Sequence, residues 1–246
     1  MKKINRVGEK HITNEGYELE IIEYFNKRNC SVLLIEDNIV LKEREYRDIV
    51  KGRVKNPFKR NIYGIGFYGV GQYISKVNSV KQKNYQTWVG MLQRAYSEDY
   101  KNKYPTYKGC SVAEEWNNFQ NFAEWFEENY IEGFVLDKDI LVRGNKTYSP
   151  ETCCFVPQEI NALFLKNVDG ALAKGINKRG NKFIVRVGNF GKLLNLGIYD
   201  TYEESLEVCE KYKSQYSKQI ADKWKGQIDL KVYKAIYNYY KETKIK

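Results

Sequence analysis

Apolar and polar residues alternate with a period of two near the start of the chain, which is the pattern of a half-buried β-strand. Asp37-Asn38 interrupts the apolar runs and is typical of a hairpin turn. Residues 1–60 are therefore predicted to form a small, β-rich, barrel-like module. Its strands are expected at Tyr17–Tyr24, Ser31–Ile35 and Ile39–Lys42.

The pattern changes to a helical period in the middle of the chain. Residues 61–84 are rich in Gly and Tyr and are predicted to be a linker or extended loop. Amphipathic helices follow at residues 85–97 and 113–130. The apolar positions of the two helices recur at spacings of three and four, so they are expected to form a core. They are Trp88, Met91, Leu92 and Ala95 in the first helix, and Trp116, Phe119, Ala123, Phe126 and Tyr130 in the second.

The stretch Leu136–Phe164 predicts a β-hairpin followed by a helix. A polar turn rich in Gly, Asn and Ser separates the acidic start of this stretch from the short apolar run Cys153–Val156. Pro157 then leads into an expected helix at Gln158–Leu165, since proline is favoured at the beginning of a helix. We expect residues 85–165 to form one central module around this hairpin and helix.

Residues 166–246 are predicted to form a third module. Three short strands are expected at Ala171–Asn177, Lys182–Gly188 and Leu193–Tyr199. Thr201 and Glu204 have the spacing of a capping box, which predicts that a helix begins at this point. A further helix is expected at Lys231–Thr243. The fold class predicted for the whole chain is therefore α+β, built from three small modules.

Composition adds charge to this picture. The net charge is +10, divided as +4 over residues 1–60, −2 over residues 61–165 and +8 over residues 166–246. Basic modules at both ends favour a polyanionic partner, most often nucleic acid, although a solubilising surface charge remains an alternative. The five cysteines are scattered and form no CxxC pair, so reduced thiols are expected. We expect a soluble, cytoplasmic protein without a membrane segment.

Two parts of the sequence resemble known families. The strands from Lys174-Gly175-Ile176 through Gly191-Lys192 to Tyr199-Asp200-Thr201 resemble the AP2-type DNA-binding domain. Leu136–Phe164 and the segment before it, which includes Tyr107 and Gly109–Val112, resemble the ββα-metal, or HNH, domain of bacteriophage homing-endonuclease-type proteins. The first module is similar to a small module that precedes some of these phage proteins. The resemblances imply a phage-encoded protein that acts on duplex DNA in a bacterial host cell.

The HNH resemblance implies specific roles, some of which this sequence does not fill. The family uses a histidine base, metal ligands at an Asp and a helix residue, and a central Asn that fixes the loop. Asp137 matches the ligand Asp, with Asp139 close by, and Asn161 matches the ligand on the helix. Lys138 stands at the base position and Thr152 at the central Asn. A lysine ammonium has no lone pair for a proton, and His11, the sole histidine, lies far away in the sequence.

The AP2 resemblance implies that an exposed sheet face enters the major groove, which is wide enough for β structure. The strand alternation places Lys182 and Arg186 on one face, away from Phe183, Val185 and Val187. The candidates for DNA contacts are Lys174, Lys178, Arg179, Lys182, Arg186 and Lys192, with Arg53 and Lys55 in the first module.

Three functions remain open at this point. The first is a DNA-binding protein whose HNH-like centre is inactive. The second is an active nickase or homing endonuclease, for which Asp137, Lys138 and Asp139 are catalytic candidates, and Asp137 and Asn161 would bind Mg²⁺ or another divalent metal. The third is a phage protein that binds an acidic host protein. None of them implies a small-molecule cofactor, and the oligomeric state is left open.

Overall fold

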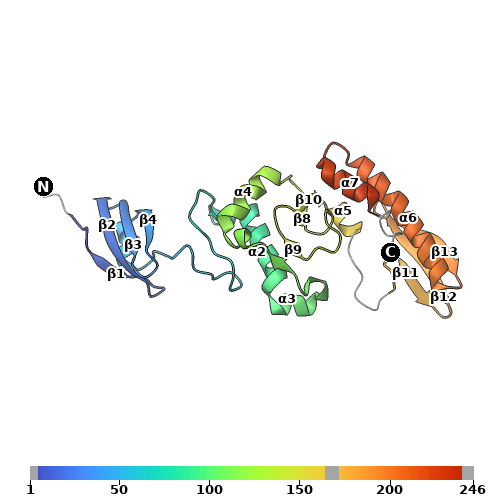
Figure 1. Cartoon of the computed structure of the whole chain (residues 1–246), viewed down its shortest axis with the longest axis horizontal. Helices are drawn as coiled ribbons and strands as arrows, with labels where there is room; N and C mark the ends of the chain where they lie inside the picture. The colour runs from blue at the N-terminus through green and yellow to red at the C-terminus, as the bar shows by residue number, and fades with distance from the viewer. Residues whose placement is uncertain (1–4, 164–171, 240–246) are drawn as a thin grey trace. The chain divides into compact units, whose positions relative to one another are not determined.

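The structure, a computed structural model, describes residues 5–163 and 172–239. Helices and several small sheets alternate along the chain, so the predicted α+β class is confirmed (Figure 1). The density of internal contacts divides the chain into two units. One unit is residues 1–59 with 67–70, and the other is residues 60–66 with 71–246.

The first unit is built on one antiparallel sheet of four strands in sequential order. The expected barrel is wrong in one respect: the edge strands of this sheet do not pair with each other in the described chain, so the sheet stays open. The strand at residues 10–12, which the sequence did not reveal, is too short to show an alternating pattern. The elements are β1 Lys10–Ile12, β2 Glu18–Asn26, β3 Asn29–Leu34, β4 Ile39–Arg44 and the short helix α1 Tyr46–Val50.

The inward face of this sheet carries the apolar half of the alternating pattern. Leu19, Ile21, Val32 and Leu34 are fully buried and pack as one cluster. The predicted turn between β3 and β4 is present, and Asn38 has a φ of 53°, a left-handed conformation that asparagine tolerates. The hydrophobic effect on this single face therefore holds the first unit together.

Two helices form the core of the central module. Helix α2, Lys83–Tyr96, buries all four residues of its predicted apolar stripe. The second predicted helix is broken: a 3₁₀ turn, η2 Glu114–Asn117, precedes helix α4, Phe119–Asn129. The break follows from Asn118, whose side chain accepts a hydrogen bond from the backbone N–H of Gln120 and so caps α4.

The Gly- and Tyr-rich segment packs on these helices. A Cβ atom at Gly66 would collide with Leu92 and Trp88, and one at Gly71 would collide with the Gln120 side chain. Glycine at both positions lets the backbone approach these side chains closely, and a Cβ there would force them to move. The remaining short elements of this region are β5 Lys76–Val77, β6 Val80–Lys81, α3 Glu98–Lys103 and η1 Pro105–Tyr107.

The predicted hairpin and helix are present. Strand β8, Phe134–Asp137, pairs antiparallel with β10, Cys154–Pro157, and helix α5, Gln158–Leu163, follows directly. The connection between the two strands contains β9, Thr147–Tyr148, which pairs in parallel with β7, Ser111–Val112. This pairing fixes the long connection to the helical part of the module. The last two residues of the predicted helix lie outside the described residues.

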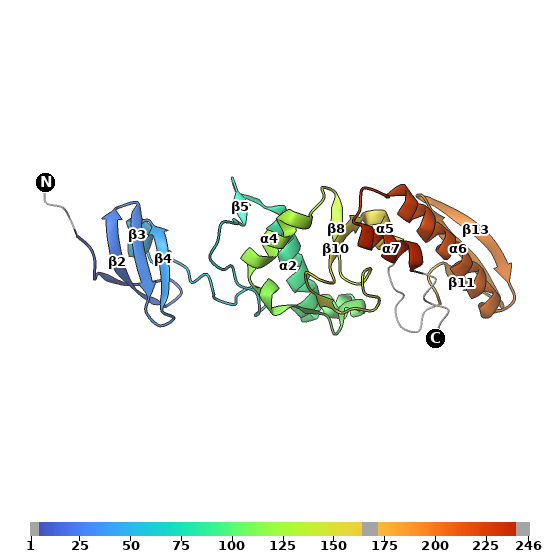
Figure 2. The ribbon, with the colours of Figure 1, turned by 45° about the horizontal axis from the view of Figure 1, so that its top comes forward.

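The C-terminal module is a three-stranded antiparallel sheet with a helix along one face (Figure 2). The strands are β11 Ile176–Arg179, β12 Lys182–Asn189 and β13 Lys192–Tyr199, and the helices are α6 Tyr202–Lys223 and α7 Leu230–Asn238. The capping box is present: Thr201 Oγ1 accepts from the Glu204 N–H at 3.2 Å, and Glu204 Oε2 accepts from the Thr201 N–H at 3.3 Å.

The first strand of this sheet begins later than predicted, at Ile176, and continues to Arg179. The predicted start near Ala171 falls partly outside the described residues. Val185, Val187 and Cys209 pack together between the sheet and α6, as the alternation along β12 predicts. Within the described ranges, no helix is both long and apolar enough to cross a membrane.

Candidate functional site

The exposed face of the C-terminal sheet gathers three of the predicted basic residues. Residues that pair directly across an antiparallel sheet lie on the same face. Arg179 pairs with Lys182, so these two side chains share a face. Arg186 follows Lys182 at a spacing of four along β12 and therefore lies on the same side. All three are exposed, and α6 covers the opposite face.

Amide and apolar side chains complete this face. Asn177 on β11 pairs with Ile184 on β12, and Asn195 on β13 pairs with Arg186 on β12. Ile184 also pairs with Ile198, which is 59% exposed. We call this set the basic sheet face. It consists of Asn177, Arg179, Lys182, Ile184, Arg186, Asn195 and Ile198.

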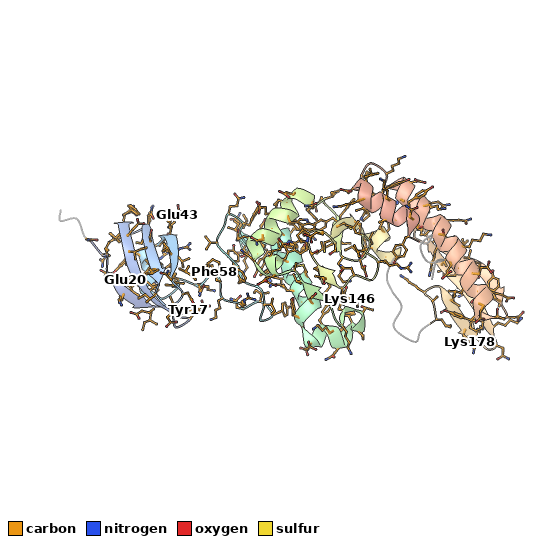
Figure 3. All side chains as sticks on the ribbon, in the orientation of Figure 1. Tyr17, Glu20, Glu43, Phe58, Lys146 and Lys178 are labelled. Carbon is orange, nitrogen blue, oxygen red and sulfur yellow. The ribbon has the colours of Figure 1, made fainter. Side chains whose placement is uncertain are left out.

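The alternation separates Lys178 from the basic sheet face. Lys178, labelled in Figure 3, pairs with Phe183 on the side that packs against α6. Its Nζ lies 5.7 Å from the centre of the Phe183 ring. Lys192 pairs with Asn189 at the end of the hairpin, on the same side of the sheet as Val187. Five of the six lysines and arginines predicted as one contact set are thus divided between the two faces of the sheet, because the strand period is two.

Lys174 lies before the first strand of the sheet. Its Nζ donates to the backbone oxygen of Ala162 at 2.9 Å. Burial and the neighbouring Lys213 lower the pKa of Lys174. Lys174 is exposed, but its ammonium group is already bound to a backbone oxygen, so it is a weaker candidate for a DNA contact than the cations on the strands of the sheet.

Arg53 and Lys55 project from the first unit in the way the sequence suggests. They alternate with Gly52, Val54 and Asn56, which are buried, so both basic side chains face solvent. Arg53 lies 3.5 Å from Asp48 in an exposed ion pair. Such a pair contributes at most about 1 kcal/mol, so a phosphate can compete for the guanidinium.

Asp137 ends strand β8 and turns the chain. Its Oδ1 accepts hydrogen bonds from the N–H groups of Asp139 and Ile140, both at 2.8 Å. Burial and the nearby Asp139 raise the pKa of Asp137, and the two N–H groups oppose this shift. One carboxylate oxygen therefore has a structural role, which is the Asx-turn role common for aspartate at the end of a strand.

Lys138 is almost completely enclosed beside these carboxylates. Its Nζ lies 3.4 Å from Asp139 Oδ2, donates to the Asn145 backbone oxygen at 3.2 Å and is 5.8 Å from the centre of the Tyr148 ring. A carboxylate, a carbonyl and an aromatic face are the surroundings that suit an ammonium group. An ammonium group cannot accept a proton from water, so this geometry does not supply the base that the HNH chemistry needs.

Asn145 fixes the loop that follows β8, although the sequence mapping assigned this role to the position of Thr152. The Asn145 amide donates to the backbone oxygens of Lys138 at 2.7 Å and Thr147 at 2.6 Å, and its Oδ1 accepts from the Thr147 N–H at 3.1 Å. Thr152 Oγ1 also donates to the Thr147 oxygen, at 2.9 Å. Three backbone groups of one loop are thus bound by a single side chain.

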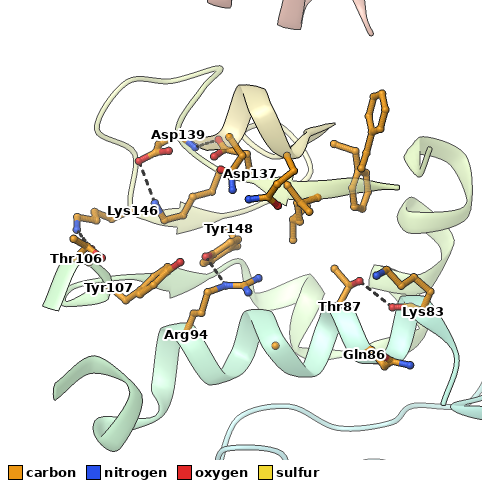
Figure 4. Close-up of a pocket in the computed structure, with 18 residues that line it drawn as sticks. Lys83, Gln86, Thr87, Arg94, Thr106, Tyr107, Asp137, Asp139, Lys146 and Tyr148 are labelled. Carbon is orange, nitrogen blue, oxygen red and sulfur yellow. Dashed lines mark hydrogen bonds and ion pairs between the residues drawn. The ribbon is translucent and has the colours of Figure 1, made fainter. Parts of the chain in front are cut away.

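A cavity of about 490 Å³ lies between helix α2 and strand β8 (Figure 4). Asp137, Lys138, Asp139 and Asn161 all line it, so the structure brings the predicted catalytic and metal-binding residues to one place. Carboxylate and amide oxygens of this kind are suitable ligands for Mg²⁺. Over the described parts of the chain, no three His, Cys, Asp or Glu side chains are placed to hold a metal ion together.

Sequence reasoning missed three further cations that line this cavity. Arg94 from α2 and Lys146 from the loop before β9 both line it, as does Lys83. The sequence did contain one signal that could have drawn attention to Arg94, namely Gly90, a glycine one turn earlier inside an otherwise regular amphipathic helix. Glycine inside a helix is unfavourable and so indicates a special local requirement.

The five cysteines take no part in either site. All of them are buried and unpaired. Burial raises the pKa of Cys153 to about 12, and it also raises the pKa of Cys154. At neutral pH both groups are therefore thiols, the unreactive form.

Comparison of the chain with protein-family models, with curated proteins and with solved structures found no match. The two candidate sites therefore rest on the geometry of this chain and on its sequence.

Proposed function

We propose that this protein binds duplex DNA through the basic sheet face. The observation that carries the proposal is the arrangement of Arg179, Lys182 and Arg186 on one uncovered side of a three-stranded sheet. Lysine and arginine side chains neutralise phosphates, and each such contact releases counterions from the DNA. The major groove of B-DNA is wide enough to admit β structure.

The other side chains of the basic sheet face suit recognition of bases. Asn177 and Asn195 carry amides, which donate and accept hydrogen bonds and pair well with adenine in the major groove. Ile198 is exposed and offers apolar surface to a thymine methyl group, and the buried Ile184 packs beneath it on the neighbouring strand. The face therefore combines groups that hold the backbone with groups that read sequence, which a purely solubilising surface does not need.

Lys182 of this face forms an ion pair with Asp200. Its Nζ lies 2.7 Å from Asp200 Oδ1, and the two side chains are 59% and 76% exposed. An exposed pair is worth little in water, so a DNA phosphate can replace the carboxylate. We expect Asp200 to remain near the backbone of the DNA and to oppose tight non-specific binding.

The central module acts in this proposal as an HNH-like scaffold that does not cut DNA. Support comes from Lys138, which stands at the base position among contacts suited to an ammonium group. His11 lies in β1 of the first unit, and the residues that line the cavity all come from the second unit.

The alternative function is a divalent-metal-dependent DNA nickase. It is favoured by one observation: Asp137, Asp139 and Asn161 line a single cavity and together offer oxygen ligands. A metal ion bound there would stabilise charge on a phosphate. Lys138 already lies 3.4 Å from Asp139, so a cation at this carboxylate would compete with the lysine.

Plasmid nicking separates these two functions. Purified protein is incubated with supercoiled plasmid and Mg²⁺ or Mn²⁺, with Asp137→Ala as the matched variant. The scaffold proposal expects no nicking by either protein. Nicking that disappears in Asp137→Ala would establish the nuclease instead.

DNA binding is tested by fluorescence anisotropy with a labelled duplex. Changing Lys182 and Arg186 together to Ala should weaken binding by at least about tenfold, because each charged contact contributes about 1.5–3 kcal/mol. The control removes two charges elsewhere in the module, with Lys178→Ala and the exposed Lys211→Ala on α6. Equal losses in the two double variants would show that the sheet face has no special role.

A further inference from the structure

The cavity between α2 and β8 contains more positive than negative side chains. Lys83, Arg94, Lys138 and Lys146 line it, against Asp137 and Asp139. One carboxylate oxygen of Asp137 is already bound by two backbone N–H groups, and Lys138 lies against Asp139. The acidic pair is thus largely compensated within its own loop. Lys146 of the same loop, and Lys83 and Arg94 of α2, form no ion pair with a carboxylate in the described part of the chain.

Arg94 is the cation whose placement is most unusual. Its Nε donates to the Tyr148 hydroxyl at 3.1 Å, and its guanidinium lies 5.7 Å from the centre of the Tyr148 ring (Figure 4). No carboxylate of the described chain forms an ion pair with it. The hydroxyl and the ring fix the plane of the guanidinium and leave its terminal nitrogens for another group. An arginine held in this way presents a rigid pair of donors.

Gly90 keeps the space beside this guanidinium open. It lies one turn before Arg94 on α2 and lines the same cavity. The sole heavy atom that comes within 4 Å of a Cβ built at Gly90 is Arg94 Nη1, at 3.7 Å. Glycine inside a helix lowers its stability relative to alanine, and here no steric contact requires it. The open space in front of the guanidinium is what an alanine would fill.

We propose that this cavity binds a phosphodiester group of a DNA strand, with Arg94 as the main donor and Lys146 as a second cation. Arginine pairs with phosphate oxygens through two parallel hydrogen bonds, and the cavity volume of about 490 Å³ accommodates a nucleotide-sized group. The inference extends the proposed function, because it makes the central module a second DNA contact instead of a spacer.

Lys146 is placed to act at the edge of the cavity. Its Nζ donates to the backbone oxygen of Thr106 at 2.7 Å, and the side chain is exposed. A carbonyl oxygen positions the ammonium without neutralising its charge. Tyr107, the next residue after Thr106, also lines the cavity and offers an aromatic face to a neighbouring base.

The test observes the guanidinium itself. The full chain is labelled with ¹⁵N-arginine, and the Arg94 Nε–Hε resonance is identified by its loss in Arg94→Lys. A thymidine tetranucleotide is the probe. We expect the Arg94 resonance to shift progressively during the titration and the resonance of Arg143, which lies outside the cavity, to stay unchanged. A tetranucleotide that binds without moving the Arg94 resonance would overturn the proposal.

Three variants measure affinity for the same probe with a fluorescent label. Arg94→Met and Lys146→Met should each weaken binding by about tenfold or more, as expected for a charged hydrogen bond to phosphate. Gly90→Ala should also weaken it, while its unfolding midpoint stays at or above that of the wild type. This combination separates a filled cavity from a damaged fold. Arg143→Met is the matched control, and an equal loss in that variant contradicts the proposal.

Two further arms assign the source of the phosphate and separate this inference from the proposed function. If inorganic phosphate moves the Arg94 resonance at the same concentrations as the tetranucleotide, the site binds free phosphate and the DNA assignment is wrong. The Lys182→Ala/Arg186→Ala variant should retain the Arg94 shift. Unchanged duplex affinity in this variant, with the Arg94 shift present, would contradict the sheet proposal alone. Reduced duplex affinity in this variant, with no Arg94 shift in the wild-type protein, would contradict the cavity proposal alone.

Discussion

Changing Asn145 to Ala should destabilise the central module by about 2 kcal/mol. The Asn145 amide binds two backbone oxygens and one backbone N–H of the loop between β8 and β9. Each neutral hydrogen bond contributes about 0.5–1.5 kcal/mol, and water replaces part of this because the side chain is partly exposed. The backbone oxygen of residue 145, which accepts from Lys138, is retained in the variant.

The assay is urea unfolding followed by tryptophan fluorescence. Trp88 and Trp116 are buried in the core of the central module, so their emission reports its unfolding. The midpoint should fall and the dependence of the free energy on urea should stay the same, because the surface exposed on unfolding is unchanged. Asn145→Asp retains an acceptor and loses both donors, so it should destabilise the module at least as much as alanine does.

Asn121→Ala is the control within the same module. Asn121 donates one exposed hydrogen bond to the Glu115 oxygen at 3.0 Å, and its loss should change stability by less than about 0.5 kcal/mol. A loss below about 0.5 kcal/mol in Asn145→Ala itself would refute the reasoning, since it would show that the loop keeps its form without this side chain.

Two further predictions concern the cap of helix α6 and the buried carboxylate of Asp137. Thr201→Ala should lower the stability of the C-terminal module by about 1 kcal/mol, because it removes the capping box. The control is Glu203→Gln, which lies outside the box and should change stability by less than about 0.5 kcal/mol in the same urea assay. Asp137→Asn keeps the Oδ1 acceptor and removes the buried charge. Because the folded pKa of Asp137 is raised above 3.8, wild-type stability falls as pH rises through this range. The variant should therefore gain most at pH 7, and its advantage should disappear at the acidic end of a thermal-unfolding series; an advantage independent of pH contradicts this.

Local signals in the sequence predicted most of the elements. The stripe Trp88, Met91, Leu92 and Ala95 is buried as its spacing indicates, and Thr201 begins α6 because its hydroxyl satisfies a free N–H at the helix end. The parallel pair β7 and β9 was not predicted. Each strand has two residues, which is too few for a period, and 34 residues separate Val112 from Thr147.

The candidate sites were predicted less completely than the elements. The carboxylates and Asn161 were found because they lie in one stretch of sequence, whereas Arg94 and Lys146 join them through tertiary contacts. Lys178 faces the opposite side from Lys182 because its neighbour Arg179 is the residue that pairs with Lys182, and adjacent positions of a strand alternate between the two faces. That period of two is also what makes the two lysines a matched pair for an experiment.

Chemical acetylation of lysines, with and without duplex DNA, tests the central claim most directly. Lys182 is exposed on the basic sheet face, and Lys178 is exposed on the opposite side of the same hairpin. Mass spectrometry of the full chain should show that DNA protects Lys182 and leaves the reactivity of Lys178 unchanged. Protection of Lys178 with no protection of Lys182 would contradict the proposal that the basic sheet face binds DNA.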